Sequence, residues 1–294
     1  GLKVLISSAT LDAGGFSEFF NKAPVIHVEG RTFPVETHYL PKENTEDTSR
    51  HVARAIEWIS RTDRSGDILV FLPGEREIRE CADVLDGRSW GGTKILPLFA
   101  SLGLNEQQEV FSPNGRSRRV ILATNVAETS LTIPGIVYVV DTGVARVSRW
   151  SPARQVQRLQ IEKTSQASAN QRKGRCGRVS EGVCVRLYEE ECFDERSEFT
   201  DPEIRRSSLA GVILRMKSLG LASIEEFPFL DPPSSKHISE GYRTLREINA
   251  LDGDSTLTLD FANGNPIPNG DITFNGGTLT YEFDFLIFHC NLWE

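Results

Sequence analysis

The chain has 294 residues, enough for one large domain or two smaller ones, each with its own core. Its 39% hydrophobic and 25% charged residues are typical of a soluble folded protein and argue against a disordered or fibrous chain. The sequence has no apolar run near the roughly 20 residues of a membrane-spanning helix, and its first residues do not resemble a signal peptide.

The five cysteines are scattered and form no C-x-x-C pair, so neither a zinc site nor a disulfide framework is indicated. They are Cys81, Cys176, Cys184, Cys192 and Cys290. His289 lies next to Cys290, but two potential ligands do not make a metal site. We therefore predict reduced thiols, no bound metal on these residues, and a cytoplasmic location.

The net charge of −8 is unevenly distributed along the chain. Between Gly115 and Arg178 there are twelve Lys or Arg against three Asp or Glu, so this segment carries +9 and the remainder −17. A basic segment inside an acidic protein is typical of a polyanion site. Charge alone therefore leaves nucleic acid open as a partner.

The first predicted elements are two short apolar strands at 2–6 and 24–28, with a short helix over 16–20 between them. Gly, Pro and charged residues at 29–46 predict a connection between domains. Because a chain that opens with a buried strand is unusual, we expect this one to have been cut from something longer.

From residue 46 onward, apolar strands alternate with amphipathic helices. The predicted strands are 67–72, 94–99, 120–124, 136–141 and 182–188. One helix, around Ile56, precedes the first strand, and two more, around Ile78 and from Asn105 to Phe111, follow the first and second strands. Such alternation predicts a parallel sheet covered by helices on both faces. Ligands of such sheets bind beyond the carboxyl ends of the strands, where Thr124, Asn125 and Asp141 fall.

Residues 144–161 alternate apolar with polar or basic side chains and are broken by Ser151-Pro152, which predicts a β-hairpin. Trp150 in this hairpin has two interpretations. It packs on the domain surface, or it stacks on a nucleic-acid base, a contact worth ~1 to 3 kcal/mol.

A small helical module follows. Asp201-Pro202-Glu203 predicts the start of a helix that runs to Leu219 and ends at Gly220, and apolar residues at 245–251 predict a second helix. From about residue 254 the composition shifts to Thr, Asn, Gly and Phe, which predicts short strands joined by turns.

The octapeptide at 171–178 reads Gln-Arg-Lys-Gly-Arg-Cys-Gly-Arg, with Arg172, Arg175 and Arg178 spaced by three. Arginine presents a planar fork of donors that matches phosphate oxygens. The alternative is an ordinary basic turn at the surface. Taken alone, the octapeptide favours a phosphate site but leaves the basic turn open.

Four motifs in order carry a resemblance to the DEAH-box helicases. They are Ser8-Ala9-Thr10, Leu72-Pro73-Gly74-Glu75, the stretch Thr124-Asn125-Val126-Ala127-Glu128-Thr129-Ser130-Leu131-Thr132-Ile133, and the octapeptide. Ser165 to Asn170, which leads into the octapeptide, is most similar to the bacterial HrpA-type subgroup. The resemblance runs from Leu2 to about Thr258, whereas 259–294 resembles nothing in the family.

The resemblance implies a role for each matching residue. Arg175 and Arg178 would be arginine fingers reaching the γ-phosphate of ATP, with Gln171 beside them. Phe111 would stack on the adenine, and Ser130, Ser8 and Thr10 would respond to the nucleotide. Gly74, Thr124, Asn125 and Thr129 would hold the RNA backbone, joined by Trp150 on what resembles the strand-separating hairpin.

The resemblance also implies a domain plan. Residues 1–35 would end a first RecA-like domain, 36–206 would form a second, 207–258 would begin a winged-helix module, and 259–294 would be an unassigned β-rich tail. The fold class is therefore α/β, a RecA-like parallel sheet flanked by helices with an inserted hairpin.

The sequence contains no G-x-x-x-x-G-K-[ST] phosphate loop and no Asp-Glu-x-His run for Mg²⁺. We therefore expect ATP with Mg²⁺ as cofactor, but with most of its ligands on a missing first RecA-like domain. The expected substrate is single-stranded RNA, with DNA a second candidate and no membrane partner. Two alternatives stay open: a non-catalytic nucleic-acid-binding module, and an interaction protein whose β-rich tail adds to another sheet.

Overall fold

A computed structural model describes residues 4–6, 12–27, 33–43, 45–61, 65–88, 90, 92–112, 117–129, 131–151, 154, 156–258, 272–274 and 277–279, without the side chains of 104–106, 129, 272–274 and 277–279. The described chain divides into two compact units, residues 1–147 with 159–200 and residues 148–158 with 201–294.

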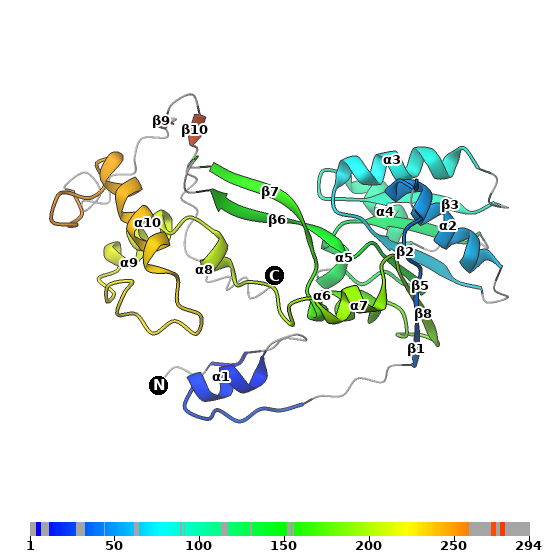
Figure 1. The fold of residues 1–294 in the computed structure, drawn as a ribbon, viewed down its shortest axis with the longest axis horizontal. Helices are drawn as coiled ribbons and strands as arrows, with labels where there is room; N and C mark the ends of the chain where they lie inside the picture. Colours follow the sequence, from blue (N-terminus) through cyan, green and yellow to red (C-terminus); the bar gives the residue numbers. More distant parts are fainter. Residues whose placement is uncertain are drawn as a thin grey trace. The chain divides into compact units, whose positions relative to one another are not determined.

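The first unit is built on a six-stranded parallel sheet of order β1-β8-β5-β2-β4-β3 (Figure 1). Its strands are β1 (Val35–Tyr39), β2 (Asp67–Phe71), β3 (Lys94–Leu98), β4 (Arg119–Ala123), β5 (Ile136–Asp141) and β8 (Gly182–Arg186). Every residue of β4 and β8 is buried. This near-continuous burial is what a parallel sheet covered on both faces requires, and it confirms the predicted fold class.

Alternate residues of the central strands enter two separate cores, one on each face of the sheet. The first core contains Ile68 and Val70 of β2 and is covered by α2 (Thr48–Ser60) and α3 (Glu75–Asp86). The second contains Leu69 and Phe71 and is covered by α4 (Leu104–Phe111) and α5 (Val126–Thr129). The strand period of two thus sorts side chains between the layers.

Two further helices of this unit are α6 (Gln166–Lys173) and α7 (Glu190–Asp194). Ser165 caps α6, since its hydroxyl accepts a hydrogen bond from the N–H of Ser168 at 3.1 Å. The octapeptide therefore starts on the last turns of α6 and continues into the segment before β8. Residues 174–178 of that segment are called the arginine loop below.

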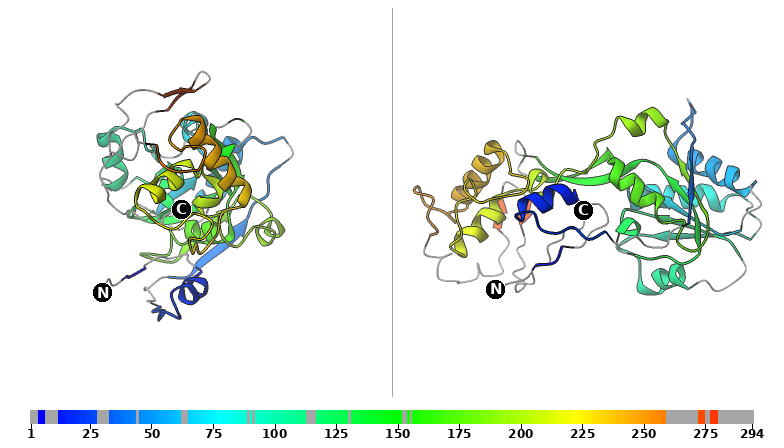
Figure 2. Two further views of the ribbon diagram at one scale, coloured as in Figure 1. Left: turned by 90° about the vertical axis from the view of Figure 1, so that its left-hand side faces the viewer. Right: turned by 90° about the horizontal axis from the view of Figure 1, so that it is seen from below.

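The predicted hairpin forms as β6 (Val144–Ser151) and β7 (Val156–Lys163), which make a two-stranded sheet of their own. In the second unit α8 (Glu203–Arg206) is followed by α9 (Ala210–Ser218) and α10 (Ser235–Glu247). Helices α9 and α10 lie side by side in both views of Figure 2 and share a core with Leu209, Ile213 and Leu245. Short strands β9 (Ile272–Phe274) and β10 (Gly277–Leu279) pair antiparallel in the tail.

Two predicted apolar strands near the start are wrong where the structure describes them. Residues 4–6 and 24–27 are not in strands, and Leu5 and Ile26 are 91% and 81% exposed. An apolar run becomes a strand only where a neighbouring strand satisfies its backbone groups. The helix between them is present as α1 (Ala13–Phe19).

The predicted connection at 29–46 was also wrong in part, because it contains β1. This strand pairs with β8 from Val35 to Tyr39 and forms one edge of the sheet. Downstream, the single helix predicted to run from Pro202 to Leu219 is divided into α8 and α9, and α10 ends at Glu247, before Leu251. Leu251 instead forms an isolated β-bridge with Leu257.

Candidate functional site

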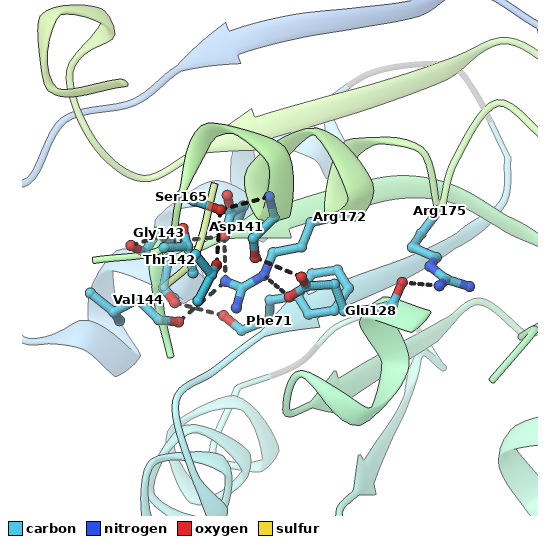
Figure 3. A network of polar contacts seen from close by, with 12 residues as sticks. Phe71, Glu128, Asp141, Thr142, Gly143, Val144, Ser165, Arg172 and Arg175 are labelled. Atoms are coloured by element: carbon cyan, nitrogen blue, oxygen red, sulfur yellow. Dashed lines mark hydrogen bonds and ion pairs between the residues drawn. The ribbon is translucent and has the colours of Figure 1, made fainter. Parts of the chain in front are cut away.

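Arg172 is a completely buried cation that joins three elements of the first unit. From the last turn of α6, its Nε donates to the Oε2 of Glu128 on α5 at 2.9 Å. Its Nη1 donates to the Oδ1 of Asp141 at the end of β5 at 2.8 Å. The guanidinium carbon lies 4.9 Å from the ring centroid of Phe71. Figure 3 shows this arrangement from close by.

The charges around Arg172 compensate one another inside the protein. Burial alone would lower the pKa of Arg172, but the carboxylates of Asp141 and Glu128 outweigh burial and raise it. The Nη2 atom is buried without a hydrogen-bond partner among the described residues. An arginine kept inside at that cost is better explained by a need for defined geometry than by stability, because well-packed apolar side chains often stabilise a fold as much.

Glu128 connects the octapeptide to the segment that begins at Thr124. Its Oε1 accepts from the hydroxyl of Ser168 on α6 at 2.6 Å, beside the bond from Arg172. Its backbone carbonyl oxygen accepts from Nη2 of Arg175. Two motifs far apart in the sequence thus meet at one acidic residue.

Arg175 and Arg178 project from the arginine loop towards residues 128–132. Arg175 is half-buried and also donates from Nη1 to the carbonyl oxygen of Leu131 at 3.0 Å. Burial, and next the charge of Arg178, lower the pKa of Arg175 to about 10. Arg178 is exposed and donates from Nη1 to the hydroxyl of Thr132 at 3.2 Å.

Both arginines line one shallow depression at the surface of the first unit. Its other lining residues are apolar: Leu69, Ala127, Leu131, Ile133 and Ile136. Among these described residues there is no carboxylate. Two neighbouring cations of which one has a depressed pKa, over an apolar floor, make a place where a bound anion would be stabilised.

The other predicted site residues lie at the edges of this arrangement. Thr124 and Asn125 follow β4 and are half-buried, and their carbonyl oxygens accept from the N–H groups of Ala127 and Glu128 at 3.1 and 2.8 Å. Thr129 ends α5. Gln171 lies on α6, one residue before Arg172, and is half-buried. The structure therefore brings the octapeptide and the segment 124–132 together.

Gly74 is the N-cap of α3, and the ends of two long side chains lie close to it. A Cβ there would lie 2.8 Å from Nε of Arg146 and 2.9 Å from the Oε2 of Glu77. Arg146 comes from β6 and pairs with Glu77 at 3.3 Å. Gly74 thus lies beside the start of the hairpin.

Two further predicted residues, Phe111 and Trp150, lie on other elements. Phe111 ends α4 and packs half-buried against the second core, and it is not among the residues that line the depression. Trp150 is half-buried on β6. Ser8, Thr10 and Ser130 lie outside the described residues.

Part of the basic segment is neutralised within the fold. Arg119 binds Asp67 with Nη2 at 2.6 Å, and Arg149 binds Asp201 at 3.0 Å. With the buried Arg172 and with Arg146 beside Glu77, at least four of its twelve cations have acidic partners among the described residues. The positive charge that remains to bind a polyanion is therefore smaller than the sequence count of +9 indicates.

Neither a metal cluster nor a membrane segment is found in the described part of the chain. No group of three or more His, Cys, Asp or Glu there could hold a metal ion. None of its helices is long and apolar enough to span a bilayer.

Comparison with known proteins gives matches across most of this chain. Residues 50–180 match the model of the helicase conserved C-terminal domain. The ATP-dependent RNA helicase HrpA homolog of Haemophilus influenzae is 54% identical over 253 residues, which are 85% of this chain and 19% of that protein. HrpA of Escherichia coli is 54% identical over 258 residues, covering 86% of this chain and 20% of that protein.

More distant relatives agree. The probable ATP-dependent RNA helicase DHX35 of Homo sapiens is 40% identical over 276 residues, covering 87% of this chain and 39% of that protein. The crystal structure of the E. coli DExH-box NTPase HrpB has a TM-score of 0.80 and 36% identity, covering 87% of this chain and 31% of that one. The chain thus spans about a fifth of the length of the HrpA proteins that it matches.

A parallel sheet with this order of motifs, matched by that family model and that solved structure, defines the class: the chain carries a RecA-like helicase C-terminal domain. Its similarity to the two bacterial HrpA proteins makes the family more specific. The chain belongs to the DEAH-box helicases of the HrpA type.

Proposed function

We propose that residues 36–206 form the second RecA-like domain of an ATP-dependent RNA helicase and supply the arginine side of its nucleotide site. Arg175 and Arg178 would stabilise the γ-phosphate of ATP·Mg²⁺, with Gln171 beside them. The observation that carries this proposal is the pair of neighbouring guanidinium groups over a depression whose described lining residues include no carboxylate. Arginines presented in this way stabilise the charge that develops in phosphoryl transfer.

Arg175 can exchange its present partners for a phosphate. Its two bonds go to the carbonyl oxygens of Glu128 and Leu131, which are neutral acceptors. A phosphate oxygen is a charged acceptor and forms the stronger bond. Binding of a triphosphate would therefore draw Arg175 away from α5.

We propose that RNA binds beside this site. Thr124 and Asn125 follow a buried strand, where their polar groups would bind backbone phosphates without reading sequence, and Gly74, Thr129 and Trp150 would extend the contact. Phe111 would contact the adenine, and Ser8, Thr10 and Ser130 would respond to the nucleotide. Residues 1–35 would belong to the first RecA-like domain, residues 207–258 to a winged-helix module and 259–294 to a separate tail.

A polypeptide of these residues would not hydrolyse ATP by itself, because it has no phosphate loop and no acidic run for Mg²⁺. A first RecA-like domain would be the partner that supplies them. Such a protein works on RNA in the cytoplasm, which also suits its buried thiols. The test is steady-state hydrolysis of ATP with Mg²⁺ and single-stranded RNA. Hydrolysis that Arg175→Ala abolishes would contradict the proposal.

Binding tests the two contact regions separately. Fluorescence anisotropy with a labelled single-stranded RNA should show binding that weakens at least tenfold between about 50 and 200 mM salt, as phosphate contacts require. Inorganic pyrophosphate at about 10 mM should raise the melting temperature, by linkage, in the unchanged protein but not in Arg175→Ala or Arg178→Ala. Arg158→Ala on the hairpin is the matched loss of a cation and should keep the pyrophosphate response.

The outcomes separate the proposal from the non-catalytic alternative. RNA binding without any response to pyrophosphate would mean a nucleic-acid-binding module and would overturn the nucleotide role. Absence of RNA binding at about 50 mM salt would overturn the RNA role, since electrostatic contacts are strongest there.

A further inference from the structure

Gly143 immediately precedes β6 and Thr164 immediately follows β7, and these two residues close the root of the hairpin. The N–H of Thr164 donates to the carbonyl oxygen of Gly143 at 3.0 Å. Arg196, which follows α7, completes the closure from outside the hairpin. Its Nη1 donates to the carbonyl oxygen of Gly143 at 2.7 Å and to that of Thr164 at 2.8 Å.

Arg196 is held in place by Tyr188, the second residue after β8. The guanidinium carbon of Arg196 lies 4.1 Å from the centroid of the Tyr188 ring. Gly143 has φ +73°, and a Cβ there would lie 2.5 Å from Cδ1 of Tyr188 and from Nη2 of Arg196. The ring and the guanidinium group therefore occupy the space that the glycine leaves open.

Tyr188 also connects the root to the buried ion pairs. Its hydroxyl donates to the Oδ2 of Asp141 at 3.1 Å, while the Oδ1 of Asp141 accepts from Arg172 at 2.8 Å. Burial, together with the nearby carboxylate of Asp141, raises the pKa of Tyr188, so the hydroxyl stays protonated and remains a donor. The carboxylate of Asp141 thus binds both Tyr188 and Arg172, which lies on α6 two residues before the arginine loop.

These contacts form one continuous series inside the first unit. In order they join Arg196, Tyr188, Asp141, Arg172, Glu128 and Arg175. The Nε of Arg196, like the Nη2 of Arg172, is buried without a partner among the described residues. Retaining two incompletely bonded cations is costly, which favours a role in fixing geometry.

We propose that Tyr188 and Arg196 are positioning residues that make the arginine loop and the hairpin root change together. This inference rests on the proposed function for its meaning, since the arginine loop is where the nucleotide would bind. A phosphate that draws Arg175 from the carbonyl oxygen of Glu128 disturbs α5. Glu128, Arg172 and Asp141 then pass the disturbance to Tyr188, and Arg196 passes it to Gly143 and Thr164.

Amide hydrogen exchange, read by mass spectrometry on the full chain, tests the coupling in the free protein. Tyr188→Phe keeps the ring against Arg196 and Gly143 and removes only the bond to Asp141. Exchange should become about tenfold faster at the root and also at residues 172–177, because one bond to a buried charge is lost. Tyr39→Phe is the matched control: it removes a hydroxyl that accepts from Nη1 of Arg186 at 2.9 Å and lies outside the series.

Faster exchange at the root alone, or an equal rise across β3 and α3, would overturn the coupling. Inorganic pyrophosphate provides a second measurement that a merely structural role would not change. It should alter exchange at both the arginine loop and the root in the unchanged protein, but only at the loop in Tyr188→Phe. A root response that survives in Tyr188→Phe would overturn the role of Tyr188.

The two proposals fail in different ways. If pyrophosphate does not alter hydrogen exchange at the arginine loop of the protein without substitutions, the proposed nucleotide role is wrong. The comparison of Tyr188→Phe with Tyr39→Phe still tests the coupling in that case. If Tyr188→Phe does not fold, Arg196→Lys replaces it. Lysine keeps a charge but lacks the planar guanidinium group that lies against the Tyr188 ring, so exchange should again become faster at both the root and residues 172–177.

Discussion

Glu128 and Arg172 form a charge-assisted hydrogen bond of 2.9 Å, in which the arginine side chain is fully buried and the glutamate side chain is 11% exposed. Asp141, also fully buried, completes the group. Because these charges are withdrawn from water, removing one of them leaves the others uncompensated.

Arg172→Ala should lower the free energy of unfolding by about 3 to 5 kcal/mol, the usual loss when one partner of a buried pair is removed. Chemical denaturation followed by circular dichroism measures it. Arg76→Ala is the matched control, because Arg76 pairs with Glu80 on the exposed face of α3. The control should leave the denaturation midpoint unchanged. An equal loss of unfolding free energy in both variants would contradict the stabilising role of the buried Arg172.

The two glycines of the arginine loop should differ in their tolerance of a side chain. Gly177 has φ +77°, and a Cβ there would lie 2.5 Å from Cγ2 of Val35 and 2.8 Å from the carbonyl oxygen of Phe33. Gly174 has φ −67°, and a Cβ there would have ordinary contacts at 3.4 Å or more.

We therefore expect Gly177→Ala to cost about 1 to 3 kcal/mol of unfolding free energy, and Gly174→Ala to change it by less than about 1 kcal/mol. Thermal denaturation of the two variants gives the comparison. Equal tolerance at both positions would show that the close approach to β1 is not maintained in solution.

The described thiols should react at very different rates in the native protein. Burial raises the pKa of Cys81 and Cys176 to about 12 and that of Cys184 still further, whereas Cys192 is half-buried. Iodoacetamide at about pH 8 should therefore modify Cys192 first, since the thiolate is the reactive form. Peptide mapping by mass spectrometry follows each cysteine separately, and early labelling of Cys184 would contradict its burial.

The raised pKa values of these thiols also predict how the stability of the protein changes with pH. Their folded pKa values lie above the ordinary value of 9.0, so the unfolded chain loses these protons first. Their contribution to stability is complete below about pH 9 and is lost progressively as the pH rises towards 12. The test compares the urea midpoints of Cys176→Ser and of the protein without substitutions at about pH 8 and pH 10. The midpoint of the protein without substitutions should fall further between these two pH values than that of Cys176→Ser.

Trp150 tests the two interpretations of the hairpin. If its ring stacks on a base, Trp150→Ala should weaken binding of single-stranded RNA by one to two orders of magnitude, or ~1 to 3 kcal/mol, while Trp150→Phe keeps much of the affinity. Anisotropy titrations at one salt concentration measure both. Unchanged affinity with a lower melting temperature would instead support simple packing.

The central strands could be predicted because burial on both faces leaves a continuous apolar run in the sequence. Residues 68–71 and 120–123 are such runs, and they form β2 and β4. β1 was missed since its sequence, Val-Glu-Thr-His-Tyr, is mostly polar, as an edge strand can be. The opposite error occurred at 4–6, where apolar residues suggested a strand but none forms.

The residues of the candidate site also divide into those that the sequence could predict and those that it could not. The order of the motifs pointed to Arg175 and Arg178, and they do line one depression. The sequence grouped Arg172 with Arg175 and Arg178 in a possible phosphate site, whereas the structure buries Arg172 between two carboxylates. Its spacing of three from Ala169, another buried residue of α6, was the available sign that it faces inward. Glu128, Tyr188 and Arg196 could not be assigned beforehand, because their partners come from elements far away along the chain.

The pairing of β1 with β8 has a consequence for how the protein is made. Tyr39 and Arg186, which bond across these strands, are 147 residues apart. On a ribosome, β1 emerges early and has no partner until β8 has been synthesised, and β5 keeps an open edge for as long. Because the arginine loop immediately precedes β8, it should acquire its final position in one of the last steps of co-translational folding, when the sheet closes.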